Sequence, residues 1–211
     1  MPAPTAPTPS ARTIAITQWP DINETAGRLL TAAAEAFADK GFHATTTRDI
    51  ASGAGLSPAG VYVHFSSKED VLFQLSRAGH EEALHLVTAA VASSPSPVVA
   101  LQALVSTFSA WHADNYAIAR VVQHEFPHLS PEHRDEVLRM RKQIDATVRS
   151  VLRAGVVSGD FTVDHEADTS LALLSIIVDV ARWYAPSVRR TPAEIGRTNA
   201  ALALRLVGYR G

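Results

Sequence analysis

The sequence predicts an all-α protein of about nine helices, with a three-helix head followed by a larger helical domain. Three observations support this fold class. Apolar residues recur at helical spacing along most of the chain, capping Ser, Thr or Asp residues precede these runs, and no segment alternates as a half-buried strand does. With 211 residues, 46% of them apolar, the chain is long enough to bury a sizeable core.

The composition of the chain indicates its cellular location and the kinds of partner it can bind. There is no cysteine, no apolar run approaching the roughly 18 residues of a membrane span, and no apolar core of a signal peptide near the first residue. We therefore expect a cytoplasmic protein without disulfides or a membrane partner. The net charge of −2 gives little long-range attraction to nucleic acid, so any DNA binding must come from the placement of charges.

The first twenty residues differ from the rest of the chain. They open MPAPTAPTPS, with four prolines in ten residues and no apolar periodicity, which predicts a disordered arm over residues 1–20. Arg12 would allow this arm a weak minor-groove contact. Asp21 and Glu24 then form a capping box, and apolar residues at helical spacing predict a helix that stops at Gly41.

The stretch TTRDIASGAGLSPAGVYVHFSSK, residues 46–68, predicts two short helices joined by a glycine turn. Thr46 and Asp49 form a capping box, so a helix begins near Thr47. Gly55 offers the positive φ that ends it, and Ser57 followed by proline starts a second helix, which runs to about residue 64. This helix-turn-helix has a second member narrow enough to enter the DNA major groove, and it closes a predicted head over residues 21–68.

Small side chains mark the second of these helices. Pro58, Ala59 and Gly60 would let its backbone approach base edges closely, whereas bulky residues there would hold it away. Tyr62 and His64 follow with donors at their tips, and phosphate contact is the plausible use of such donors. A helical hairpin buried in a core would instead place apolar residues at these sites.

Residues 22 to about 75 closely resemble the DNA-binding domain of the TetR (tetracycline-repressor-like) family of bacterial regulators. The pattern G-F-x-A-T-T-T-x-x-I-A-x-x-A-G-L-S-x-x-x-V-Y-x-H-F-x-x-K-E matches from Gly41 without a gap. The resemblance implies a transcriptional repressor that binds a double-stranded DNA operator as a homodimer and is released by a small-molecule effector. Many relatives carry Lys, Arg, Gln or Asn where Pro58 and Ala59 stand, so few direct base hydrogen bonds are expected. The DNA-facing residues that it implies are Thr47, Arg48, Ser57, Pro58, Ala59, Gly60, Tyr62, His64 and Lys68.

Residues 69–211 are expected to form the ligand-binding and dimerisation domain. Expected helices run over residues 68–91, 97–115, 116–126, 131–157 and 165–185, with a last helix after Thr191. The last two are apolar on most of their circumference, and such helices must be covered on both sides. Two of them per chain predict a symmetric four-helix interface between two subunits.

Aromatic, polar and charged residues set among the apolar middle helices are candidates for a ligand pocket. Residues 182–186, RWYAP, are similar to the C-terminal region of TetR-type regulators that respond to acyl-CoA thioesters. Arg120 and Arg182 are the cations expected to meet an anionic group, so an acyl-CoA is the leading effector and a neutral drug-like or steroid-like molecule the runner-up. The candidate ligand-binding residues are Trp111, Asn115, Tyr116, Arg120, His124, Arg182, Trp183 and Tyr184.

One motif supports an alternative function. His124, Glu125 and His128 match the H-E-x-x-H pattern of zinc proteases, which would make the chain a small all-α enzyme or metalloprotein. That motif needs both histidines on one face of a continuous helix, whereas Pro127 breaks the turn between them. No phosphate loop or nucleophile elbow is present either, so we expect neither catalysis nor a cofactor.

Overall fold

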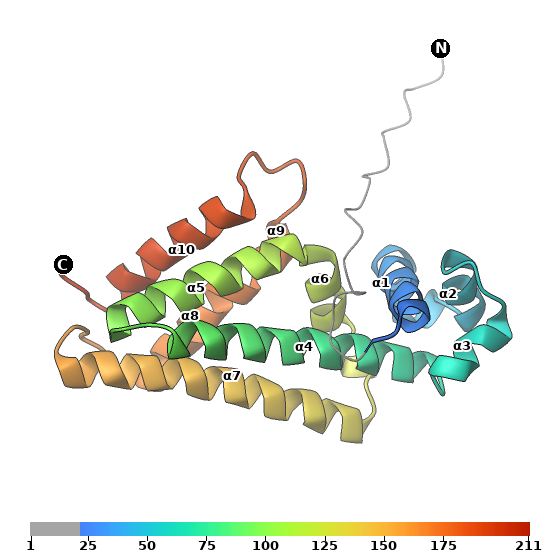
Figure 1. Ribbon diagram of the computed structural model, residues 1–211, viewed down its shortest axis with the longest axis horizontal. Coiled ribbons are helices and arrows are strands. Elements are labelled where there is room, and N and C mark those ends of the chain that lie inside the picture. Colours follow the sequence, from blue (N-terminus) through green and yellow to red (C-terminus); the bar gives the residue numbers. More distant parts are fainter. Residues whose placement is uncertain (1–21) are drawn as a thin grey trace, which may run out of the picture.

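The computed structural model describes residues 22–211, which fold into α-helices without a strand (Figure 1). The elements are α1 (Glu24–Ala44), α2 (Thr47–Gly53), α3 (Pro58–His64), α4 (Lys68–Ala92), α5 (Pro97–Asp114), α6 (Tyr116–His124), the 3₁₀ helix η2 (Phe126–His128), α7 (Pro131–Ser158), α8 (Glu166–Val178), α9 (Val180–Trp183) and α10 (Pro192–Leu206). The all-α prediction is confirmed. The expected arm over residues 1–20, including Arg12, lies outside the described residues.

Helices α1, α2 and α3 form a head at one end of the molecule (Figure 1). Within the described residues α1 is capped by Asn23, whose side chain accepts a hydrogen bond from the backbone N–H of Ala26 at 2.9 Å. The sequence predicted a capping box of Asp21 and Glu24, whereas the structure begins α1 at Glu24 with Asn23 as its cap; Asp21 itself lies outside the described residues. Gly41 has φ 76° inside the range of α1, so the regular helix breaks at the residue where the sequence predicted its end.

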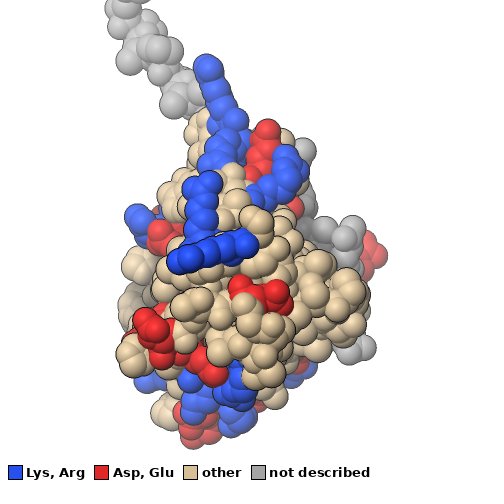
Figure 2. All heavy atoms as spheres, turned by 90° about the vertical axis from the view of Figure 1, so that its left-hand side faces the viewer, with Lys and Arg blue, Asp and Glu red and all other residues tan. Residues whose placement is uncertain are grey.

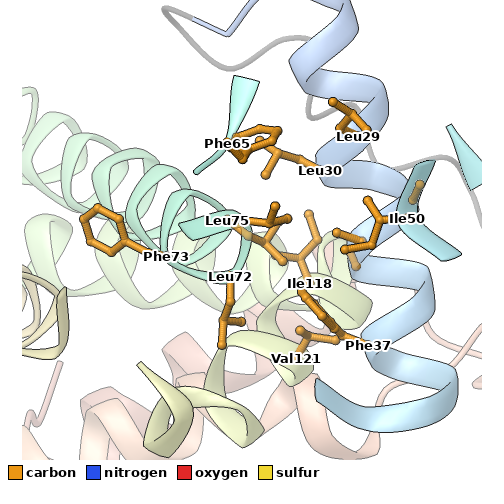
Figure 3. Packing of buried hydrophobic residues seen from close by; sticks show 14 of the residues in the cluster. Leu29, Leu30, Phe37, Ile50, Phe65, Leu72, Phe73, Leu75, Ile118 and Val121 are labelled. Atoms are coloured by element: carbon orange, nitrogen blue, oxygen red, sulfur yellow. The ribbon is translucent and has the colours of Figure 1, made fainter. Parts of the chain in front are cut away.

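The core of the head continues into the larger domain. Figure 3 shows Phe37 and Ile50 of the head close to Leu72 and Leu75 of α4 and Ile118 of α6. These five side chains are buried and belong to one apolar cluster. Burying such side chains is favourable by roughly 1.5–3 kcal/mol each, so α4 and α6 are held firmly against the head.

The larger domain is a bundle in which α4, α5 and α7 run along the long axis of the molecule, with α8 and α10 packed beside them (Figure 1). Its separate core includes Leu101 and Leu104 of α5, Val148 of α7 and Leu173 of α8. Helix α10 approaches α5 at Gly196, where an added Cβ would lie 2.3 Å from the carbonyl oxygen of Ser106. Glycine therefore sets the distance between these two helices.

The single helix expected over residues 165–185 is two helices in the structure, α8 and α9, which meet at Asp179. Arg120 of α6 donates to the carbonyl oxygens of Ala181 and Tyr184, each at 3.1 Å, and these bonds hold α9 against α6. Between residues 22 and 211, no helix is long and apolar enough to cross a membrane.

Candidate DNA-binding surface and effector cavity

The first helix of the helix-turn-helix is fixed by a complete capping box. Thr46 Oγ1 accepts from the backbone N–H of Asp49 at 3.1 Å, and Asp49 Oδ2 accepts from the backbone N–H of Thr46 at 2.8 Å. Hydrogen bonds from Thr46, with the ammonium of Lys40 at 3.2 Å, lower the pKa of Asp49 to about 2. The carboxylate is therefore charged at neutral pH and holds the start of α2 in place.

The turn between α2 and α3 depends on glycine. Gly55 has φ 66°, and this reversal lets the backbone N–H of Leu56 donate to the carbonyl oxygen of Ala51 at 2.8 Å. Arg28 of α1 donates to the carbonyl oxygen of Ala54 and would lie 3.2 Å from a Cβ added at Gly55. A side chain there would be strained by the backbone and crowded by Arg28.

Helix α3 starts at the residues that the sequence indicated and presents its small side chains to solvent. Ser57 Oγ accepts from the backbone N–H of Gly60 at 3.3 Å, and Val61 is fully buried and anchors the helix. Tyr62 is 58% exposed, with its hydroxyl 3.2 Å from Thr47 Oγ1 of α2. The structure thus brings two hydroxyls from different helices to one surface point, an arrangement that could bind a phosphate.

Lys68 occupies a different position from the other predicted DNA contacts. Its ammonium donates to the carbonyl oxygens of Phe42 at 2.6 Å and Thr45 at 2.7 Å, and it lies 4.4 Å from the centre of the Phe42 ring. These acceptors are at the C-terminal end of α1, where cations are favoured by the helix dipole. A phosphate contact by Lys68 stays a prediction, because the observed partners are carbonyl groups.

A cavity of about 280 Å³ lies between α4, α5, α6, α7 and α8. Its wall is largely apolar, with a few polar groups, the composition expected for a small-molecule site. The lining residues are Gly79, His80, Ala83, Phe108, Trp111, His112, Ile118, Ala119, Val122, Gln123, Arg141, Ile144, Leu174 and Val178.

Two neutral histidines line this cavity. Burial lowers the pKa of His80 and of His112 to about 4. Nδ1 of His80 lies 2.7 Å from the carbonyl oxygen of Ser76, and Nδ1 of His112 lies 2.9 Å from that of Phe108. A carbonyl oxygen only accepts, so each Nδ1 carries the proton and each Nε2 is an acceptor.

Of the eight residues predicted to bind a ligand, Trp111 alone is among those that line this cavity. Arg120, Tyr116 and Tyr184 instead form the contact between α6 and α9, with the two tyrosine rings 5.6 Å apart. Arg182 pairs with Asp179 on the surface. The remaining three, Asn115, His124 and Trp183, lie outside the cavity wall as well. Ligand roles for all eight residues, Trp111 included, stay predictions.

The sequence interpretation missed Arg141, the cation that does line the cavity. A signal for it existed, because Val137, Arg141, Ile144 and Val148 follow one another at helical spacing and the other three are buried. A charged residue within the apolar stripe of a helix faces the protein interior, and such a position indicates a specific role for the charge. His80 interrupts the inner face of α4 in the same way.

The histidines of the H-E-x-x-H motif do not share a helix. Helix α6 ends at His124, whereas His128 belongs to η2, stacks on the ring of Phe42 at 5.3 Å and pairs with Glu125 at 3.4 Å. Across residues 22–211 no group of three or more His, Asp or Glu residues is placed to hold a metal ion. This geometry differs from the single helix face that the zinc motif requires.

An exposed helix-turn-helix joined to a helical domain with a cavity defines a class of protein, the ligand-binding transcriptional regulators. Two family models match the chain. Residues 29–75 match "Bacterial regulatory proteins, tetR family", and residues 94–207 match "Tetracyclin repressor-like, C-terminal domain". The chain belongs to the TetR family of bacterial transcriptional regulators.

Individual relatives agree with this assignment. The HTH-type transcriptional repressor KstR2 of Rhodococcus jostii is 31% identical over 194 residues, covering 88% of this chain and 95% of the relative. The solved structure of the ketosteroid transcriptional regulator KstR2 of Mycobacterium tuberculosis superposes with a TM-score of 0.81 at 29% identity, over 90% of this chain and 97% of that one. AibR, solved with isovaleryl coenzyme A and operator DNA, shares the fold, with a TM-score of 0.77 at 20% identity over 85% of this chain and 97% of that one.

Proposed function

We propose that the protein is a repressor that binds a palindromic operator as a homodimer and is released from it by a small molecule. The observation that carries this proposal is the exposed, small-residue surface of α3 on a head whose core is shared with the cavity-bearing domain. Because its target is DNA, the site of action is the bacterial cytoplasm. Operator half-sites should lie about 34–36 Å apart or at a multiple of that distance.

The proposed DNA contacts are those that the sequence indicated, with the exception of Lys68. Arg48 is exposed beside the paired hydroxyls of Thr47 and Tyr62, and it would meet the phosphate backbone. Pro58, Ala59 and Gly60 would face the bases, where apolar contact and close backbone approach replace side-chain hydrogen bonds. Ser57 and His64 at the two ends of α3 complete this surface. Lys68 is assigned a positioning role, since it ties the end of α1 to α4.

The homodimer is proposed from the apolar residues that α8 and α10 expose. Leu171 is 66% exposed on α8, and Leu202 and Leu206 are 43% and 45% exposed on α10. Large apolar side chains gathered on the outer faces of two helices favour burial in an interface. Figure 2 views the end of the molecule remote from the head and shows several basic side chains in a row toward the top, with separate acidic patches and wide uncharged areas between them.

Release requires that the cavity and the head be mechanically connected, and α6 provides the connection. Ile118 and Val122 line the cavity and also belong to the apolar cluster that includes Phe37 and Ile50 of the head. A ligand that displaces α6 therefore presses on the head core as well as on α4, the long helix that joins the two parts. A hundredfold loss of operator affinity needs about 2.7 kcal/mol of coupling, within the usual range.

An acyl-CoA thioester is the proposed effector, with its acyl group in the cavity. The cavity is near the lower limit of the roughly 300–1,000 Å³ typical of ligand pockets, so it suits an acyl group better than a whole coenzyme. One protein of the same fold, AibR, was solved with isovaleryl coenzyme A, which is consistent with this choice. A neutral steroid-like molecule is the second candidate, favoured by the name of the ketosteroid regulator KstR2.

A gel-shift assay with the intergenic DNA beside the gene tests the proposal. Wild-type protein should shift a fragment that carries an inverted repeat, and a panel of acyl-CoA thioesters should include one that releases it while the matching free acids do not. Binding of a lone half-site by a monomer as tightly as the full repeat would refute the dimeric operator. Release by an uncharged steroid alone would replace the acyl-CoA with the second candidate.

A further inference from the structure

Arg141 is a cation without a counter-ion in the wall of an apolar cavity. Throughout residues 22–211, no carboxylate lies within 4.0 Å of its guanidinium, although eight other ion pairs are formed there. Its contacts are a hydrogen bond from Nε to His80 Nε2 at 3.1 Å and the ring of Phe126, whose centre is 4.2 Å away. The guanidinium is partly buried. Removing a charge from water, even in part, is costly unless the charge is paired, so a negatively charged ligand group would stabilise it.

The neighbours of Arg141 do not supply negative charge. His80 accepts the hydrogen bond as a neutral ring, because its Nδ1 proton is donated to the carbonyl oxygen of Ser76. His112, on the facing helix α5, donates its own Nδ1 proton to Phe108 and is neutral too. The polar part of the cavity therefore carries one net positive charge, and burial lowers the pKa of Arg141 without a carboxylate to oppose it.

A second group in the same wall lacks an acceptor. The indole Nε1 of Trp111 is buried, and no hydrogen-bond partner is found for it in the described part of the chain. A buried donor left unpaired costs about 1–3 kcal/mol. Arg141 and Trp111 lie on different helices, α7 and α5, and both residues line the cavity.

We propose that Arg141 binds a carboxylate at the end of the apolar group that enters this cavity, with Trp111 as a further donor to the ligand. The proposal rests on the assignment of the cavity as the effector site. Two sources would supply this chemistry, a free apolar carboxylic acid and the CoA thioester of a dicarboxylic acid, whose acyl chain ends in a free carboxylate. A guanidinium binds a carboxylate through two parallel hydrogen bonds, which gives direction as well as affinity.

Two matched pairs of probes separate these sources. Decanoate is compared with decanol, and suberoyl-CoA, which ends in a carboxylate, is compared with octanoyl-CoA, by calorimetric titration of the full-length protein. In at least one pair the wild type should bind the carboxylate-ended probe about tenfold more tightly or better, the contribution expected of a charge-assisted hydrogen bond. Preference within the first pair identifies a free acid, which would then replace the acyl-CoA as the proposed effector, and preference within the second identifies the thioester.

Arg141→Met should abolish the preference, and Arg141→Lys, which keeps the charge but not the paired geometry, should retain part of it. Arg139→Met is the matched control, because Arg139 is an exposed residue of the same helix and should leave the preference unchanged. If Arg141→Met fails to fold by circular dichroism, the lysine variant still decides, since an undiminished preference there contradicts the paired geometry.

Two results overturn the inference: no preference in either pair for the wild type, or an undiminished preference in Arg141→Met. These titrations contain no DNA, so their failure is distinct from failure of the proposed repressor function.

Discussion

Replacing Lys68 by methionine should weaken the fold of the head more than its electrostatic attraction to DNA. The ammonium makes two short hydrogen bonds to the carbonyl oxygens of Phe42 and Thr45, at 2.6 and 2.7 Å. Hydrogen bonds to a charged group are worth about 1.5–3 kcal/mol each, but Lys68 is partly exposed, so we expect a combined loss of about 2 kcal/mol. For a chain of this size that is a fall in Tm of about 4–8 °C.

The matching DNA measurement is the salt dependence of operator binding. Each phosphate contact makes the slope of log K against log salt more negative by about 0.9, so loss of one contact in both subunits should reduce the magnitude of the slope by about 1.8. Arg48→Met, an exposed predicted phosphate contact, should show this decrease with little change in Tm. Lys68→Met should show the reverse pattern. A decrease of about 1.8 for Lys68→Met at unchanged Tm would mean that its ammonium leaves the carbonyls for a phosphate, and would refute the positioning role.

Two further predictions concern the cavity and the interface. The pKa of His112 is about 4 in the folded protein and about 6.5 in the unfolded chain. Between these values the unfolded state binds more protons, so this residue should lower the free energy of unfolding by up to about 1.4 kcal/mol for each unit that the pH falls. Urea titrations across this range should show a shallower decrease for His112→Leu, and an unchanged slope would contradict the buried neutral ring. Glutamate at both Leu202 and Leu206 should yield monomers in analytical ultracentrifugation and abolish operator binding, whereas dimers that persist would place the interface elsewhere.

Local sequence signals were sufficient for much of the fold. The ends of α2 and α3 follow from Thr46, Asp49, Ser57 and Pro58, because caps and prolines act on the backbone within one turn. The break after α8 was not predicted, because the hydrogen bonds from Arg120 to α9 join residues about sixty positions apart. The spacing of apolar residues within a helix carries no information about a hydrogen bond to a distant helix.

The cavity was predicted only in its general location among the middle helices. The sequence pattern of aromatic and charged residues predicted Arg120 and Arg182 as ligand contacts. In the structure Arg120 donates to a carbonyl oxygen of α9, and Arg182 pairs with Asp179 on the surface. Arg141 was not predicted because α7 is rich in charged residues, so one arginine at the helical spacing of Val137 and Ile144 was not distinguished from the exposed ones. Which polar residue faces inward depends on how five helices pack, which a single sequence does not state.

The most direct test of the account is the distance between the two heads of the dimer, with and without effector. The chain has no cysteine, so Glu35→Cys, at an exposed position on α1 outside the proposed DNA contacts, gives one spin-label site per subunit. Pulsed electron spin resonance should give one distance with operator DNA, and a distance changed by several ångströms when the acyl-CoA that releases the DNA is bound. The same distance in both states, at saturating acyl-CoA, would contradict release through movement of the heads.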